Sequence, residues 1–115
     1  MLAATFNITL DRAADYALVL TLKNYAGGLV TVAADEFHGQ VRESVSKKKI
    51  VDFTFSITGL SAGEVKISLS ETDTKLLRAT TDYEYDIFRV KSSETARLIA
   101  GSLNVRANTT NNATI

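Results

Sequence analysis

The side chains that could carry out acid–base or nucleophilic chemistry are few in this sequence. His38 is the only histidine and cysteine is absent, so a nucleophile would have this one imidazole as its base. A lone histidine next to Gly39, at an expected turn, is typical of a structural residue. The sequence therefore predicts no nucleophilic site, and we expect that the chain is not an enzyme.

Carboxylates are the other candidates for chemistry. Asp82, Glu84 and Asp86 alternate along one expected strand and so share one face of it. A carboxylate pair is the machinery of a glycosidase, but this spacing also suits the solvent side of a sheet, which is the interpretation we adopt. No acidic cluster has the spacing of a calcium loop, and thiolate ligands are lacking. We predict neither a metal site nor a cofactor.

The composition is that of a single globular domain without net charge. The chain has 115 residues, of which 45% are hydrophobic and 23% charged, which suits one core. Thirteen basic residues balance thirteen acidic ones, so no positive field attracts nucleic acid or an anionic membrane. No segment approaches the roughly 18 apolar residues of a membrane helix. The expected partners are therefore proteins, with no nucleic acid and no membrane.

Apolar and polar residues alternate with a period of two, which predicts strands. Seven or eight short strands joined by tight turns favour an all-β fold, and we expect an immunoglobulin-like antiparallel β-sandwich rather than a small barrel. The sandwich would occupy residues 1–106, and residues 107–115 would form a polar C-terminal tail. One short helical turn, capped by Thr72, is expected over 72–79. The expected strands are 5–10, 16–23, 29–33, 36–43, 50–58, 64–70, 82–90 and 95–106.

The start of the seventh expected strand carries a second indication of a sandwich. Asp82-Tyr83-Glu84-Tyr85 follows the expected helical turn and resembles a tyrosine corner. In that motif a tyrosine hydroxyl bonds to the backbone a few residues upstream.

The last two expected strands carry apolar residues on both faces. Two explanations stay open: a β-bulge that exchanges the faces, or an apolar patch that another subunit covers. Under the second explanation, the outward residues of these strands would join residues of the tail in a subunit interface. The expected interface residues are Phe88, Val90, Leu98, Ala100, Asn108 and Ile115.

Four segments together resemble a known family, the small immunoglobulin-like modules of tailed-bacteriophage virions, including the N-terminal domain of baseplate upper proteins. Residues 6–22 are similar to the strand, charged turn and apolar strand with which those modules begin, and residues 40–43 to a strand that ends in an arginine. Tyr85-Asp86-Ile87 and residues 98–105 are similar to their closing strands, Tyr-Asp-apolar and Leu-Leu-x-Gly-x-apolar-x-Val. The family's Gly-x-Pro-Val-Asp-Leu-Thr-Gly stretch is reduced to residues 27–32 and proline is absent, so the middle of the chain is expected to differ.

The resemblance implies a non-enzymatic structural subunit of a bacteriophage virion, in the tail, baseplate or neck, assembled in the host cytoplasm. It would act by multi-copy protein–protein assembly, as a symmetric oligomer whose partners are other virion proteins and copies of itself. The alternative is a capsid decoration protein or a host-recognition module that binds glycan or protein. Tyr25, Phe37 and His38, near expected strand ends, suggest such binding through loops.

Overall fold

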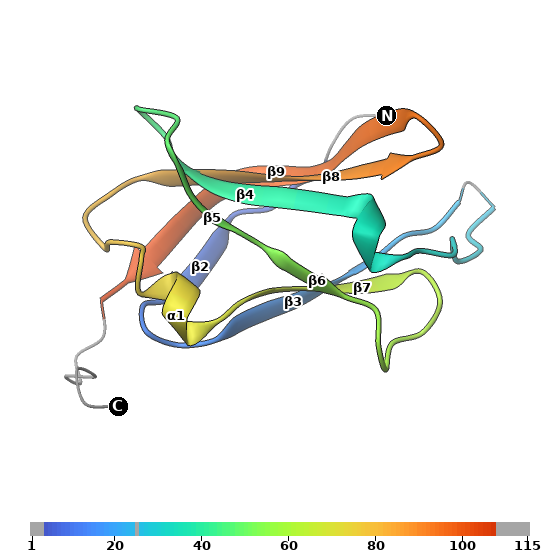
Figure 1. Cartoon of the computed structure of the whole chain (residues 1–115), viewed down its shortest axis with the longest axis horizontal. Coiled ribbons are helices and arrows are strands. Elements are labelled where there is room, and N and C mark those ends of the chain that lie inside the picture. Colours follow the sequence, from blue (N-terminus) through green and yellow to red (C-terminus); the bar gives the residue numbers. More distant parts are fainter. Residues whose placement is uncertain (1–3, 25, 108–115) are drawn as a thin grey trace.

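The computed structural model describes residues 4–24 and 26–107, which form two β-sheets packed face to face (Figure 1). This architecture confirms the predicted all-β sandwich. The larger sheet, sheet A, contains β1 (Ala4–Thr5), β2 (Ile8–Asp11), β4 (Phe37–Glu43), β5 (Lys49–Asp52), β8 (Tyr83–Lys91) and β9 (Glu94–Arg106). The smaller sheet, sheet B, contains β3 (Tyr16–Thr21), β6 (Thr54–Ser56) and β7 (Glu64–Leu69). Two short helices accompany them, the 3-10 helix η1 (Ala34–Glu36) and α1 (Glu71–Thr74).

The strand order in sheet A is β1-β9-β8-β4-β5, and β2 continues from β1 along the same side of β9. Ala4 aligns with Ile99 and Leu10 with Val105, so the N-terminal strands run parallel to β9. Every other strand pair among the described residues is antiparallel. Sheet B has the order β3-β7-β6, which leaves β3 and β6 at its two edges.

Alternation places the core between the two sheets. In β7, Val65, Ile67 and Leu69 are at most 1% exposed while Lys66 between them is exposed, as expected of a central strand with one covered face. Sheet A contributes the corresponding apolar residues of β2, β4, β8 and β9 to the same cluster. Burial of these side chains on both inner faces stabilises the sandwich.

β5 and β6 form one predicted strand, 50–58, that changes sheets halfway. Its first half pairs with β4 and its second half with β7, and the crossing is visible at the front of Figure 1. Phe53, at the crossing, is buried, and its N–H donates to the carbonyl of Gly39 at 3.0 Å. Phe55 then points between the layers and stacks on Phe37 with ring centroids 5.7 Å apart. The apolar alternation continues through the crossing, so the sequence does not mark it.

Three further predicted elements differ in the structure. The strand expected over 5–10 is divided into β1 and β2, with Phe6 and Asn7 between them. Residues 29–33 form no strand; Leu29 makes one isolated bridge to Lys23, and the chain then enters η1. The helical turn expected over 72–79 is α1, Glu71–Thr74: it begins one residue earlier because Ser70, not Thr72, is its cap, and it ends five residues earlier than expected. The Ser70 hydroxyl accepts a hydrogen bond from the N–H of Asp73, and the carboxylate of Asp73 accepts one from the N–H of Ser70. This reciprocal capping box fixes the first turn.

The tyrosine corner is present. The hydroxyl of the buried Tyr83 accepts a hydrogen bond from the N–H of Arg78 at 2.8 Å, five residues upstream. The bond connects the segment after α1 to the start of β8.

Replacement of Tyr83 by phenylalanine is expected to lower the free energy of unfolding by about 1 kcal/mol, because it removes this hydrogen bond and keeps the ring. Urea denaturation measures the difference. Tyr16→Phe is the control, since the Tyr16 hydroxyl makes no hydrogen bond within residues 4–24 and 26–107. A Tyr83→Phe variant as stable as the native chain would contradict a stabilising role for the corner.

Candidate interaction surface

A β-bulge shifts the register between β8 and β9 in the region of the expected interface residues. Ile87 aligns with Ile99, but the next residue, Phe88, aligns with Arg97, so Leu98 is an extra residue on β9. Leu98 is half-buried and packs against the core. Its assignment to the outward surface is therefore wrong, and for this residue the bulge was the correct explanation.

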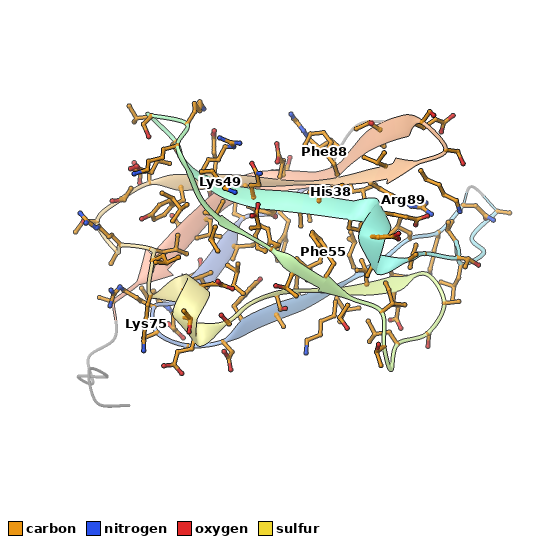
Figure 2. All side chains as sticks on the ribbon, viewed as in Figure 1. His38, Lys49, Phe55, Lys75, Phe88 and Arg89 are labelled. Carbon is orange, nitrogen blue, oxygen red and sulfur yellow. The ribbon has the colours of Figure 1, made fainter. Side chains whose placement is uncertain are left out.

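The remaining described members of the expected interface lie on the outer face of sheet A. Phe88 is half-buried on the side of the sheet that faces away from sheet B (Figure 2), and the guanidinium of Arg97 lies 5.5 Å from its ring centroid. Val90 is 39% exposed, and Ala100 lines a shallow hollow further along the sheet. Their burial by another subunit stays a prediction. Asn108 and Ile115 lie outside the described residues.

Most of this outer face is charged or polar rather than apolar. Glu84 binds Lys47 at 2.6 Å, and a longer contact of 3.9 Å joins Asp86 to Arg97. Glu84, Asp86 and Arg97 lie in the lining of an open hollow of about 400 Å³. A shallow polar surface with one aromatic side chain is typical of a protein contact, since small-molecule sites are concave and mostly apolar. Its main lining residues are Gln40, Arg42, Glu84, Asp86, Arg97, Ala100 and Ser102.

The candidates for catalysis are separated or already paired. His38 lies exposed on β4 opposite Phe88, and no hydrogen bond joins its ring to a hydroxyl in the described part of the chain. Glu84 and Asp86 share the outer face of β8 and each faces a cationic partner, whereas Asp82 precedes the strand. Within residues 4–24 and 26–107, no group of three or more His, Asp or Glu side chains is placed to hold a metal ion.

The two expected recognition residues that the structure describes, Phe37 and His38, lie in β4 and not in a loop. Phe37 is only 3% exposed and stacks on Phe55 inside the sandwich, so it offers little surface to a ligand. Its place in β4 follows from alternation, which turns every second residue of that strand toward the core. His38 is exposed, and Tyr25 lies outside the described residues.

A half-buried ion pair that the sequence analysis did not identify fixes the end of β8 to η1. The guanidinium of Arg89 donates to the Glu36 carboxylate at 3.1 and 3.2 Å and to the Thr31 carbonyl at 3.1 Å. Both side chains of the pair are about 15% exposed. The available signal was that Arg89 continues the inward positions of β8 after Ile87, where a charge requires a partner.

The pKa of Glu36 lies below its ordinary value. Burial acts to raise this pKa, but the hydrogen bonds from the Ala33 N–H and from Arg89, together with the positive charges of Arg89 and Lys91, outweigh burial. Ionised Glu36 is thus favoured in the folded protein.

Glu36→Gln is expected to destabilise the protein at neutral pH and to lose this effect in acid. Because the folded-state pKa is lowered, the unfolded chain binds the proton more tightly. Ionised Glu36 contributes fully to the free energy of unfolding when the pH is above the pKa of about 4.3 that a glutamate has in the unfolded chain. This contribution disappears as the pH falls through the lower pKa of Glu36 in the folded protein. Urea denaturation over this range measures it, with the exposed Glu94→Gln as control. If the difference in free energy of unfolding between the native chain and Glu36→Gln did not change with pH, the prediction would be contradicted.

Comparison with known proteins identifies no partner for this surface. No family model matches the sequence, and no curated protein matches it. None of the described helices has the length and apolar character needed to cross a membrane. The kind of partner therefore has to be inferred from the surface and from the resemblance of the sequence.

Proposed function

We propose that this chain is a non-enzymatic structural subunit of a bacteriophage virion, in the tail, baseplate or neck, that acts by multi-copy protein–protein assembly. The observation that carries the proposal is the placement of the segments in which the sequence resembles the virion modules. Those segments contain β2, β4, β8 and β9, which are neighbours in sheet A, and β3, which lies at an edge of sheet B. They therefore supply four adjacent strands of sheet A and one strand of the facing sheet.

The glycine of the resembling pattern has a specific place in this layer. Gly101 lies where the N-terminal strand passes β9, and a Cβ atom at this position would collide with the carbonyl oxygen of Phe6. Only glycine allows this approach without a shift of the backbone. The glycine of the closing pattern thus supports the opening strand, which favours treating the two segments as parts of one module.

Assembly through this module would be noncovalent. The outer face offers Phe88 with Arg97 over its ring and a set of opposite charges in Glu84, Asp86 and Arg42. On such a surface the charges orient the partner subunit, and burial of the aromatic side chain supplies binding affinity. Repetition around a symmetric particle strengthens each modest contact.

Mass spectrometry of virions purified from cells that produce this protein tests the proposal. The expected result is a constant ratio of the chain to the other structural proteins after gradient purification. Its absence from purified virions would overturn the proposal.

A capsid decoration or host-recognition module is the second candidate, and one observation favours it. A hollow of about 360 Å³ next to β4 has aromatic and polar residues in its lining, a combination that suits a sugar ring; they include Phe37, Phe53, Phe55, Phe88, His38, Gln40 and Asp52. A glycan array tests this function, with Phe88→Ala as the variant that should lose binding. Absence of binding by the native chain would remove this candidate.

A further inference from the structure

β3 has an open edge. Only β7 pairs with it in the described part of the chain. At the end of the strand the N–H of Leu22 donates to the Gly63 carbonyl at 2.7 Å, so the even-numbered residues direct their backbone groups toward β7. Ala17, Val19 and Thr21 consequently direct their N–H and C=O groups away from the sheet, where no described strand receives them.

The segments on either side of β3 leave this edge free. The Leu22 carbonyl accepts a hydrogen bond from the N–H of Val30. Because the N–H and C=O of one strand residue point to the same side, this carbonyl points toward β7, as the Leu22 N–H does. Val30 therefore lies on the β7 side, and the edge stays accessible as far as Lys23. At the other end, the Asp15 carboxylate accepts a hydrogen bond from the N–H of Glu71 at 2.7 Å, which fixes the start of the strand.

The core is incompletely covered at this edge. Tyr16, Leu18 and Leu20 face inward from β3, yet all three are only half-buried, whereas the inward residues of the neighbouring β7 are at most 1% exposed. On the outer face Val19 is 49% exposed. A further strand beside β3 would cover apolar surface on both faces.

β3 also lacks the features that protect edge strands. Natural edges are blunted by charges, proline, bulges or short length. Residues 16–21 contain no charge, proline or glycine, and their pairing with β7 has no register shift. The other edge strands are protected: β1 and β6 have two and three residues, β2 carries Asp11, and β5 carries Lys49 and Asp52.

We propose that a second copy of this chain pairs with this edge, β3 against β3 in antiparallel orientation, about a twofold axis through Val19. The inference rests on the proposed multi-copy assembly and specifies one of its contacts. The outward-directed residues must pair with each other, so Val19 lies opposite Val19 and Ala17 opposite Thr21. The two three-stranded sheets then become one six-stranded sheet.

Charge complementarity selects this register. When Val19 lies on the axis, Asp15 of each protomer lies opposite Lys23 of its partner, so two opposite-charge pairs close the ends of the shared ladder. A shift by two residues in either direction loses both pairs and shortens the ladder. Since the strand itself carries no charge, the twofold axis places no like charges together.

Disulfide trapping tests the register directly because the native chain has no cysteine. In the proposed pair the Cα atoms of Val19 are about 5.5 Å apart, within the range of a disulfide. Val19→Cys is expected to form a covalent dimer under mild oxidation. Thr21→Cys is the matched control, as it lies exposed on the same face but about 14 Å from its counterpart. Cross-linking of Val19→Cys no faster than Thr21→Cys would overturn the proposal.

Analytical ultracentrifugation of Val19→Lys provides an independent test. Two lysines opposite each other on the axis are expected to weaken dimerisation at least about tenfold. Thr54→Lys adds the same charge to the outer face at the opposite edge of sheet B and should leave dimerisation unchanged. Circular dichroism confirms that each monomer is folded. A native chain that stays monomeric, or a dimer that survives Val19→Lys, would overturn the pairing.

The two proposals fail separately. If the chain is present in virions but monomeric in solution, with no Val19 cross-link in solution or in the particle, only the β3 pairing is wrong. If the dimer forms and the chain is absent from virions, only the virion function is wrong.

Discussion

Ile67→Ala is expected to lower the free energy of unfolding by about 3–4 kcal/mol. Ile67 is fully buried at the centre of β7, where Leu18 of β3 and Phe55 of β6 flank it. Removal of three carbon atoms leaves a cavity that strands on both sides hinder from collapsing. Because single domains have about 5–15 kcal/mol of stability, this one change removes a large share of it.

Urea denaturation followed by circular dichroism gives the size of the loss. Lys66→Ala is the matched control, because it truncates the adjacent residue of the same strand on the exposed face and should change stability by less than about 0.5 kcal/mol. Equal effects of the two substitutions would show that sheet B does not cover the core as described.

Gly101→Val is expected to detach the N-terminal strand from β9 at a cost of about 2–4 kcal/mol. Any Cβ at this position collides with backbone atoms of Phe6, which cannot rotate away as a side chain would. The shift breaks the bond from the Phe6 N–H to the Ala100 carbonyl, the bond from the Ser102 N–H to the Asn7 amide oxygen, and the one that the Tyr85 hydroxyl donates to the Phe6 carbonyl.

Hydrogen exchange distinguishes this local effect from general instability. In Gly101→Val, the amides of Phe6 and Ser102 should lose their protection from exchange. The amides in β7 should lose only as much protection as the lower free energy of unfolding accounts for. Gly28→Ala is the control, since a Cβ there meets only the flexible side chain of Asn24. Unchanged protection at Phe6 and Ser102 would contradict the described contact.

Local alternation explains which parts of the fold were predictable. β3, β4, β7 and β8 each place one apolar face on the core, and their positions follow from the period of two. The parallel pairing of β1 and β2 with β9, and the change of sheets at Phe53, depend on contacts between residues far apart in the chain. A single strand carries no record of the direction of its neighbour, so the sequence left these features undetermined.

The candidate surface was predictable only in part, for a related reason. A strand with apolar residues on both faces fits either a bulge or an outward patch, and only the pairing of Phe88 with Arg97 distinguishes them. The bulge turns Leu98 inward and leaves Phe88 and Val90 outside. The open edge of β3 escaped the sequence analysis because an edge strand and a central strand of a half-covered sheet have the same alternation.

The position of β9 between β8 and the two N-terminal strands constrains the order in which the chain can fold. Among the strands of residues 4–24 and 26–107, β9 comes last in the sequence, yet β1 and β2, which come first, have it as their only neighbour in sheet A. During translation β1 and β2 cannot form their pairing with β9 until residue 106 has left the ribosome. Bonds such as the one between Asp11 and Arg106 span 95 positions, and closing such long loops slows folding. Sheet A is therefore completed only after synthesis of all its strands, when β9 docks between them.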